Sequence, residues 1–359
     1  MGRSTFLFLS LKGHFKQFLY IYIYRMTNQE KFVVIGSNCF SGACFVDYVL
    51  GNNPTSRVTG ISRSKEKENV FLPYKSKGKE RFHFHALDLN KHLDEIVSVI
   101  REFRPDYIVN FSAQGMVAQS WENPDQWFQT NGMALMSLAD RLKQEKYLKR
   151  FVQISTPEVY GSCSGHIKED APLNPSTPYA ASKASGDLSL IPYHKNYNFP
   201  VVFTRATNVY GAHQQLYRII PRTVIYIKQN KEIQLQGGGK AVKSYIHIRD
   251  VCAATLKIAR NGKNGEIYHI SPDGEGISIV DLVSLICAKM GRPLDDCVTM
   301  VDERLGQDAF YLIDSNKLRE SLGWKPQISL EKGIAEVIDW VEENFEAIQN
   351  SPLDYIHQP

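Results

Sequence analysis

The feature that most constrains the fold of this chain is a regular alternation of short apolar runs with amphipathic stretches, starting at residue 31. Residues 42–50 and 93–103 repeat apolar side chains at helical intervals. The apolar runs are residues 32–35, 57–61, 83–87, 107–111 and 151–154. Their apolar residues are continuous rather than alternating, which is typical of parallel strands covered by helices on both faces. The pattern therefore predicts an α/β fold with a doubly wound parallel sheet.

Beyond residue 205 the pattern loosens into shorter pieces punctuated by Pro and Gly. We expect residues 31–205 to form the sheet domain, with residues 245–265 returning to it. Residues 206–345 are expected to form mainly a smaller C-terminal domain that covers the substrate, and residues 346–359 a tail. In a doubly wound sheet, ligands bind beyond the carboxyl ends of the strands. Functional residues are therefore expected directly after the apolar runs.

Composition and charge exclude several classes of function. The formal net charge of +4 over 359 residues gives no reason to expect a nucleic-acid partner, although a mildly basic protein suits a small anionic substrate. The six cysteines show no metal-ligand spacing, so no metal site is expected. Scattered thiols indicate a reducing compartment, and we therefore expect a cytoplasmic protein.

The N-terminal residues 1–30 differ from the rest of the chain. They contain two apolar runs, residues 6–11 and 18–24, split by basic residues. Both runs are shorter than the roughly 20 residues that a membrane span needs, so no stable membrane insertion is expected. A basic, amphipathic segment without acidic residues before position 29 is also typical of transit or membrane-surface segments. We favour a disordered extension for residues 1–30.

A glycine-containing turn follows the first apolar run. Glycines at this place let backbone N–H groups at a helix N-terminus approach a pyrophosphate, as in Rossmann-type sheets that bind NAD(P). The candidate cofactor residues in the turn are Gly36, Asn38, Cys39, Phe40 and Gly42. Cys39 takes the place of a middle glycine, and a plain strand-to-helix turn remains the alternative.

Two further strand ends bear on the cofactor. The second run ends in Ser62-Arg63-Ser64 and offers no carboxylate to a ribose diol. Arg63 would instead bind a 2′-phosphate, which favours NADP, the alternative being a solvated loop arginine. Asp88, which precedes Leu89 after the third run, is placed to accept a hydrogen bond from adenine, or else to cap a helix.

The clearest chemical signal is Tyr179 four residues before Lys183, a spacing that places phenol and ammonium on one face of a helix. A nearby positive charge lowers the pKa of a phenol, so Tyr179 is expected to act as a base. Thr156 follows the fifth apolar run and would hydrogen-bond the substrate oxygen that becomes a ketone. Lys183 is expected to contact the cofactor as well. A chance Tyr-x-x-x-Lys on a helix is the alternative.

From about residue 31 to 345 the chain resembles the extended short-chain dehydrogenase/reductase family, also described as the NAD-dependent epimerase/dehydratase family. The nearest likeness is to the nucleotide-sugar 4,6-dehydratases that act on dTDP-glucose and GDP-mannose. The motifs that carry the likeness are S-T-P-E-V-Y-G at 155–161, P-Y-A-A-S-K at 178–183, N-V-Y-G at 208–211, R-I-I-P at 218–221, K-S-Y-I-H at 243–247 and R-L-G-Q-D at 304–308.

The resemblance implies a lyase that keeps NAD(P) tightly bound and converts an NDP-hexose to its 4-keto-6-deoxy product. In this reading Tyr179 takes the proton of the 4-hydroxyl, and Glu158 removes the hydrogen on carbon 5. The dTDP-glucose enzymes have an aspartate before that glutamate, and the GDP-mannose enzymes a serine, where this chain has Pro157. Glu158 itself or a bound water is left to protonate the departing hydroxyl.

The resemblance also implies residues for the substrate diphosphate, a nucleotide-sugar ligand that needs several cations and amide donors. They are Asn208, Arg218, Lys243 and Arg304, each of which taken alone could be a surface residue.

The family further implies a homodimer built on helices at 125–143 and 179–197. On the first helix we expect a set of apolar residues that exceeds what packing on one sheet face needs. They are Trp127, Met133, Leu135, Met136 and Leu138.

Other functions share parts of this pattern. A UDP-glucuronate decarboxylase or a 4-epimerase would use the same Tyr179 and Lys183. Epimerases usually lack a carboxylate at the position of Glu158, whereas decarboxylases have one. A non-catalytic dinucleotide-binding protein of the same fold would be favoured only if Tyr179 or Lys183 were missing, and both are present.

Overall fold

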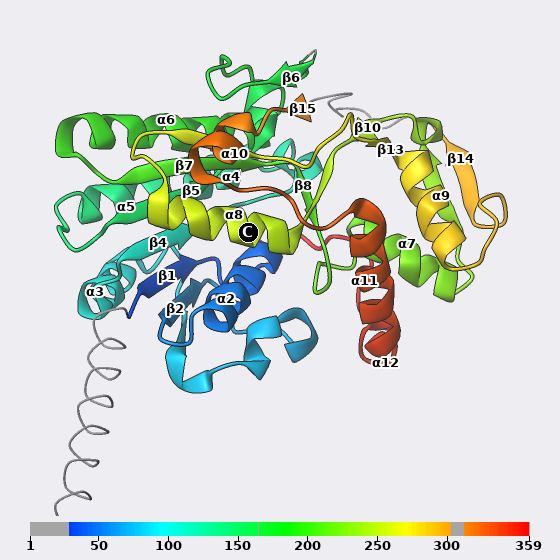
Figure 1. Ribbon diagram of the computed structural model, residues 1–359, viewed down its shortest axis with the longest axis horizontal. Helices are drawn as coiled ribbons and strands as arrows, with labels where there is room; N and C mark the ends of the chain where they lie inside the picture. Colours follow the sequence, from blue (N-terminus) through cyan, green and yellow to red (C-terminus); the bar gives the residue numbers. More distant parts are fainter. Residues whose placement is uncertain (1–28, 164, 303–311, 359) are drawn as a thin grey trace, which may run out of the picture.

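The computed structural model describes residues 29–163, 165–302 and 312–358. Its centre is a parallel sheet of seven strands in the order β12-β7-β5-β4-β1-β2-β3 (Figure 1). The strands are β1 (Lys31–Ile35), β2 (Arg57–Ser62), β3 (Phe82–Ala86), β4 (Tyr107–Asn110), β5 (Arg150–Ile154), β7 (Val201–Ala206) and β12 (Ile267–Ile270). The chain runs outward from β1 to β3 and restarts at β4 on the other side of β1. The predicted doubly wound sheet is confirmed, and ligands bind such sheets where the strand order reverses.

The inner strands of the sheet are buried on both faces. Because neighbouring residues of a strand point to opposite faces, each of these strands contributes to two cores. In β1, Val34 lies in the core formed with α2 (Phe40–Asn52) and α8 (Ile248–Asn261). Val33 lies in the opposite core, formed with α3 (Leu93–Phe103), α5 (Leu135–Leu142) and α6 (Pro178–Tyr197). Both valines are fully buried, which explains why the apolar runs in the sequence are continuous.

The C-terminal part of the chain builds a separate core beside the sheet, at the right of Figure 1. Its elements are α7 (Ile219–Lys228), α9 (Ile279–Lys289), α11 (Leu330–Glu343) and α12 (Phe345–Ile348), with the parallel strands β9 (Ile233–Gln236) and β14 (Val298–Val301). Val224, Ile286 and Val337 are fully buried at its centre. This apolar core is what holds the C-terminal helices together.

Short strand pairs and single turns connect the larger elements. The pairs are β8 (Asn208–Tyr210) with β11 (Tyr245–His247), β6 (His166–Ile167) with β15 (Leu312–Ile313), and β10 (Val242–Lys243) with β13 (Ile277–Ser278). The remaining helical elements are α4 (Pro124–Phe128), α10 (Asn316–Leu322), η1 (Asn69–Phe71), η2 (Pro73–Ser76), η3 (Lys79–Arg81), η4 (Ala118–Ser120), η5 (Gln129–Ala134), η6 (Pro157–Tyr160) and η7 (Gly237–Gly239).

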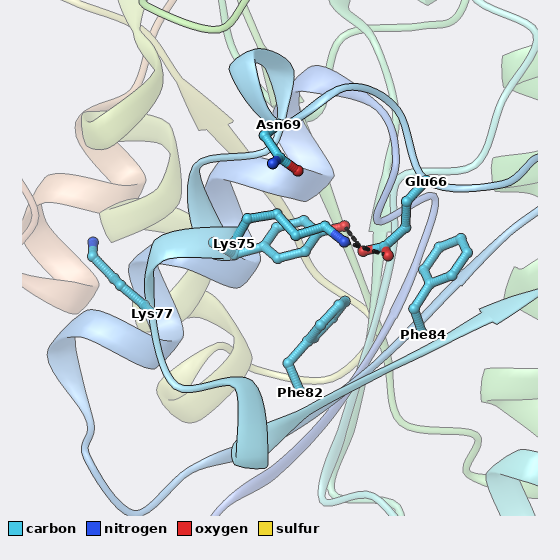
Figure 2. Close-up of a pocket in the computed structure, with 7 residues that line it drawn as sticks. Glu66, Asn69, Lys75, Lys77, Phe82 and Phe84 are labelled. Carbon is cyan, nitrogen blue, oxygen red and sulfur yellow. Dashed lines mark hydrogen bonds and ion pairs between the residues drawn. The ribbon is translucent and has the colours of Figure 1, made fainter.

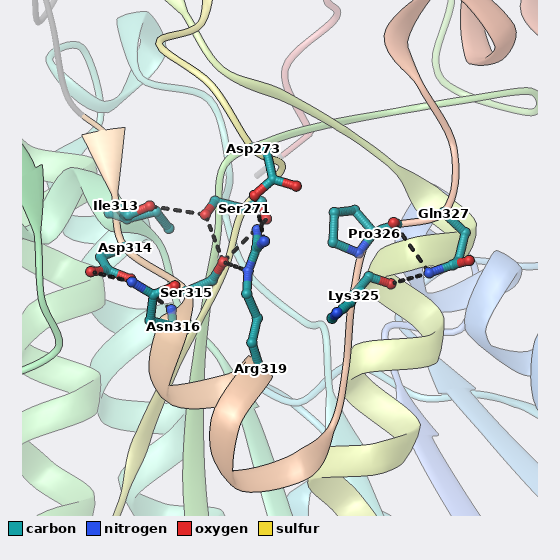
Figure 3. A network of polar contacts seen from close by, with 10 residues as sticks. All are labelled: Ser271, Asp273, Ile313, Asp314, Ser315, Asn316, Arg319, Lys325, Pro326 and Gln327. Atoms are coloured by element: carbon teal, nitrogen blue, oxygen red, sulfur yellow. Dashed lines mark hydrogen bonds and ion pairs between the residues drawn. The ribbon is translucent and has the colours of Figure 1, made fainter.

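After β11 the chain returns to the large sheet through α8 and β12. A polar network fastens the later helix α10 to the end of β12 (Figure 3). Ser271 Oγ donates to the carbonyl of Ile313 at 2.9 Å, and Arg319 Nε donates to Ser315 Oγ at 3.1 Å. Arg319 also pairs with Asp273. Residues far beyond 205 therefore take part in the sheet and its supporting layer.

The helical stretch at 124–142 is divided by a turn of π-helix, η5, between α4 and α5. Within it, the buried Asn131 donates through Nδ2 to the carbonyl of Gln114 at 3.0 Å and to Ser182 Oγ at 2.9 Å. The backbone N–H of Gln114 donates to Asn131 Oδ1 at 2.9 Å. A π-turn is a frequent feature of functional sites, and here it ties the loop after β4 to the first turns of α6.

The apolar set predicted for an intermolecular face on this stretch is wrong in part. Trp127, Leu135 and Leu138 are buried inside the chain. Leu135 and Leu138 pack in the core on one face of the sheet, and Trp127 stacks on His357. Met133 is exposed, and Met136 is half-buried. The exposed apolar side chains on these helices are Phe128, Met133, Leu188 and Tyr197.

Among the described residues, no helix is long and apolar enough to span a membrane. The expectation of a disordered extension concerns residues 1–30, of which 1–28 lie outside the described part of the chain.

Candidate active site

The glycine turn lies where β1 meets α2, and two of its glycines are required by close approaches. Gly36 has a φ of +85°, and a Cβ there would lie 2.8 Å from the backbone nitrogen of Ser112 at the end of β4. A Cβ on Gly42 would lie 2.2 Å from the carbonyl oxygen of Gly36. Only glycine fits either place, so the turn packs closely on the end of β4 and on the first turn of α2.

Cys39, in the position of the missing glycine, caps α2. Its Sγ accepts a hydrogen bond from the backbone N–H of Gly42 at 3.3 Å. Burial raises the pKa of the Cys39 thiol. The thiol is therefore neutral and adds no negative charge to a turn that would face a pyrophosphate. Phe40 is buried and packs in the core with α8.

Asn38 uses its side chain to hold the loop that carries Arg63. Its Nδ2 donates to Ser64 Oγ at 3.0 Å and to the carbonyl of Lys65 at 2.7 Å, and its Oδ1 accepts from the Lys67 N–H at 2.9 Å. Its own N–H donates to Ser62 Oγ at 2.9 Å. Asn38 therefore positions the end of β2 rather than presenting its amide to the open turn.

Asp88 and Leu89 follow β3. Asp88 Oδ1 accepts from the backbone N–H of Asn90 at 2.9 Å, and α3 begins after His92. The alternative reading of Asp88 as a helix cap is therefore wrong. Leu89 is buried in the core with α3 and α5.

Tyr179 and Lys183 lie in the first turns of α6, which Thr177 caps by accepting from the Ala180 N–H at 3.1 Å. The Tyr179 phenol shares a hydrogen bond with Thr156, and the charge of Glu158 acts on it. Thr156 and Glu158 follow β5 in the short helix η6, where Thr156 Oγ1 accepts from the Glu158 N–H at 3.3 Å. The structure thus brings three of the four predicted catalytic side chains together.

The electrostatics of Tyr179 differ from the prediction. Burial raises the pKa of the Tyr179 phenol above its usual range, and the charge of Glu158 adds to the rise. The hydrogen bond with Thr156 and the positive charge of Arg218 oppose it. The Lys183 ammonium, which we expected to lower this pKa, instead donates to the carbonyl of Ile154 at 2.7 Å.

Lys183 is itself perturbed. Burial lowers the pKa of its ammonium to about 8, and the neighbouring charge of Asp187 counteracts part of that effect. Lys183 is 4% exposed. A lysine in this position therefore titrates close to neutral pH.

A buried charged network that the sequence did not reveal lies behind Lys183. Asp187 Oδ2 accepts from Ser155 Oγ at 2.7 Å and from Arg205 Nη2 at 2.9 Å. Tyr160 also contacts Arg205 and shares a 2.7 Å hydrogen bond with His269 Nε2. Asp187 lies four residues after Lys183, the same spacing that links Tyr179 to Lys183, and that repeat could have pointed to it.

The residues predicted to bind the substrate diphosphate belong to the C-terminal part of the chain. Arg218 precedes α7, lies 5.4 Å from the ring centroid of Tyr217, and acts electrostatically on both Tyr179 and Tyr245. Asn208 Nδ2 donates to the carbonyl of Ser244 at 3.0 Å, next to Tyr245. Lys243 lies in β10. Arg304 lies outside the described residues.

A hollow of about 420 Å³ lies beside the edge strand β3 (Figure 2). It is lined by Glu66, Asn69, Tyr74, Lys75, Lys77, Phe82 and Phe84. Glu66 accepts there from Lys75 Nζ at 2.5 Å and from the Tyr74 hydroxyl at 2.8 Å. None of these lining residues belongs to the catalytic group, so this hollow is separate from it. Among the described residues no cluster suited to a metal ion is present.

The fold and this group of side chains define a Rossmann-type enzyme of the NAD-dependent epimerase/dehydratase class. The model of the GDP-mannose 4,6-dehydratase family matches residues 33–337. The chain belongs to this family, as the resemblance predicted.

Curated and solved relatives agree with that assignment. A dTDP-glucose 4,6-dehydratase of Xanthomonas campestris is 31% identical over 269 residues, which cover 69% of this chain and 76% of the relative. The crystal structure of the dTDP-glucose 4,6-dehydratase of Streptomyces venezuelae, with NAD bound, is 29% identical, has a TM-score of 0.82 and covers 90% of this chain and 100% of its own. A UDP-glucuronic acid 4-epimerase from Bacillus cereus with NAD is 25% identical, with a TM-score of 0.79, covering 87% and 99%.

Proposed function

We propose that the protein is a nucleotide-sugar 4,6-dehydratase, which converts an NDP-hexose to an NDP-4-keto-6-deoxyhexose. The observation that supports this most is the grouping of Thr156, Glu158 and Tyr179 at the carboxyl end of β5. A base for oxidation and a separate carboxylate for elimination are what a dehydratase needs and a simple dehydrogenase does not. The similarity to dTDP-glucose 4,6-dehydratases supports the same reading.

The turn of Gly36 and Gly42 fits a dinucleotide, because it joins β1 to the N-terminus of α2 at the carboxyl end of the sheet, where a pyrophosphate binds in folds of this kind. Bound there, NAD(P) would supply the acceptor for the hydride of carbon 4 and the donor of a hydride to carbon 6. We assign its binding to residues 31–205, and the covering of the substrate mainly to residues 206–345. Contacts from Cys39 and Phe40 in the turn, and from Asp88 and Leu89 after β3, belong to this proposal.

The chemistry of proton transfer falls to the protein. Tyr179 removes the proton of the 4-hydroxyl while Thr156 hydrogen-bonds the same oxygen, and the charge of Arg218 favours the tyrosinate. The 4-ketone acidifies the hydrogen on carbon 5, which Glu158 removes. Pro157 has no acidic group, so Glu158 or a water that it holds protonates the departing 6-hydroxyl.

For the substrate diphosphate we propose Arg218 and Asn208, aided by Lys243 and Arg304. Arg218 is the best supported of these, since its charge reaches the Tyr179 phenol and it borders Tyr245. A guanidinium in this position binds a phosphate bidentately.

The test of the activity is direct. Purified protein is incubated separately with dTDP-glucose, GDP-mannose, UDP-glucose, CDP-glucose and UDP-glucuronic acid. We expect one of the hexose substrates to give a 4-keto-6-deoxy product, recognised by its alkali-induced absorbance. Release of CO₂ from UDP-glucuronic acid, or inversion at carbon 4 without loss of water, would replace the dehydratase by the decarboxylase or the epimerase.

For the cofactor we propose tightly bound NAD(P), with NADP favoured by Arg63. The solved relatives hold NAD, and the preference rests on the guanidinium and on the absence of an acid at residues 60–64. Denaturing the purified protein and identifying the released dinucleotide tests it. Release of NAD alone contradicts the role of Arg63 in binding a 2′-phosphate.

We also propose a homodimer in the cytoplasm. Phe128, Met133, Leu188 and Tyr197 are between 39% and 54% exposed on adjacent helices, which is unusual for large apolar side chains that face water. All six cysteines are free thiols, as suits a reducing compartment.

A further inference from the structure

The last described residues, 353–358, leave the C-terminal helices and return to the middle of the molecule, where the chain end is marked in Figure 1. They contact parts of the chain that lie far apart in the sequence. The Tyr355 ring packs edge-on against Tyr217, with centroids 5.4 Å apart. The His357 ring stacks on Trp127, with centroids 5.2 Å apart and planes 16° from parallel. Residues 353–358 therefore join the substrate side to the sheet side, and we call them the strap.

The strap ends on two donors from the carboxyl end of the sheet. The carbonyl oxygen of Gln358 accepts from Arg63 Nη2 at 3.0 Å and from Gln114 Nε2 at 3.0 Å. Arg63 directly follows β2, and Gln114 lies in the loop that follows β4. In the sheet, β1 lies between β4 and β2. One oxygen therefore joins the segments that follow β2 and β4, the two strands on either side of β1, which leads into the glycine turn.

The strap is also attached to α4 through His357. His357 Nε2 shares a 2.8 Å hydrogen bond with Gln126 Oε1, besides its stacking on the fully buried Trp127. Gln126 and Trp127 lie in α4, away from the glycine turn. Ile356, between the two inward-facing rings, is 60% exposed. Tyr355 and His357 are therefore held by Tyr217 and by α4, and neither contact uses the backbone of the glycine turn.

We propose that the strap is a wall of the cofactor site, which closes over the bound dinucleotide and holds Arg63 in place above it. His357 and Gln358 act as positioning residues: His357 fastens the segment, and the Gln358 carbonyl orients the guanidinium. This proposal rests on the proposed function, because it presumes a dinucleotide in the turn. It gives a role to residues 353–358, which take no part in the proposed proton transfers.

The test compares the full chain with a chain that ends at Pro352. Both are purified in the same way, and the dinucleotide content and the rate of dinucleotide release into buffer are measured. We expect the shortened chain to release its dinucleotide about tenfold faster or more, because the segment that covers the cofactor is gone and such changes act mainly on the rate of dissociation. With excess dinucleotide added, kcat should stay close to that of the full chain, because the catalytic side chains are untouched.

Single variants separate the strap from a general loss of folding. His357→Ala should release dinucleotide faster, and His357→Phe, which keeps the stacking on Trp127, should restore part of the retention. Ile356→Ala is the matched control and should behave as the full chain, because its side chain faces water.

Two results overturn the proposal. If the shortened chain releases dinucleotide at the rate of the full chain, the strap plays no part in holding it. If the shortened chain binds dinucleotide more tightly, the strap competes with the cofactor instead of covering it. Failure of the proposed function looks different, since the full chain itself would then neither contain nor bind NAD or NADP.

Discussion

At the residue scale, the site depends on how burial and charge are balanced at Tyr179. Burial and Glu158 raise the pKa of its phenol, and Arg218, which comes from the other part of the chain, lowers it. The sequence spacing correctly predicts that Tyr179 and Lys183 share a helix. It does not predict that Lys183 would turn to the Ile154 carbonyl, because desolvation and nonlocal contacts are not visible in a spacing.

Lys183 leads to a prediction about pH. Because burial lowers the pKa of Lys183 to about 8, its ammonium is charged below that pH and neutral above it. The charged hydrogen bond that Lys183 donates to the Ile154 carbonyl, two residues before Thr156, therefore weakens as pH rises, and kcat/KM should fall through pH 8. Lys183→Arg keeps its charge at all these pH values, so its activity, although lower, should lack this alkaline decline. An arginine variant that declines in the same way would show that another group titrates.

At the scale of secondary-structure elements, the Asp187–Arg205 pair holds α6 against β5 and β7. Asp187 is on α6, Ser155 directly follows β5, and Arg205 is in β7. Asp187 and Arg205 are 3% and 2% exposed. A buried pair of this kind fixes the position of the catalytic helix relative to the strand ends.

Removing one member of this pair should be costly. Asp187→Ala leaves the Arg205 charge buried without its partner, and we expect unfolding in urea to require about 3–5 kcal/mol less free energy. The double variant Asp187→Ala with Arg205→Met should recover part of that loss, because no uncompensated charge remains. If the double variant is as unstable as the sum of both single changes, the two side chains do not act as a pair.

The strands were predicted from the sequence more completely than the surfaces and long-range contacts of the helices. Continuous apolar runs predicted the buried strands, since burial on both faces leaves that signature in β1. The surface of 125–143 was predicted less well, because Trp127 and Leu138 look alike in sequence whether they face the core or a partner. The π-turn at Asn131 and the strap depend on partners up to hundreds of positions away, such as Gln358 with Arg63. No local pattern encodes such contacts.

At the scale of the whole molecule, the enzyme is expected to work as a dimer. Leu188, 54% exposed on α6, lies on the apolar surface that we assign to the partner. Leu188→Glu should place a charge in that interface and give a monomer in sedimentation at micromolar concentration. Met300→Glu is the control, since Met300 is 56% exposed on β14 and should leave the dimer intact. A wild-type chain that sediments as a monomer contradicts the dimer.

The whole account depends on a division of labour between Tyr179, which serves oxidation, and Glu158, which serves elimination. The Glu158→Gln variant should keep the oxidation at carbon 4 and lose the elimination. The oxidised sugar should then stall, reduced nicotinamide should accumulate and be visible by its near-ultraviolet absorbance, and 6-deoxy product should fall by ~10² to 10⁴-fold. In the Tyr179→Phe variant neither reduced nicotinamide nor 6-deoxy product should accumulate.

Measuring reduced nicotinamide and 6-deoxy product together in the Glu158→Gln protein tests the central claim most directly. We expect much reduced nicotinamide and little 6-deoxy product. Full dehydratase turnover in that variant would contradict it, because Pro157 offers no acid or base and no other carboxylate lies between residues 150 and 168.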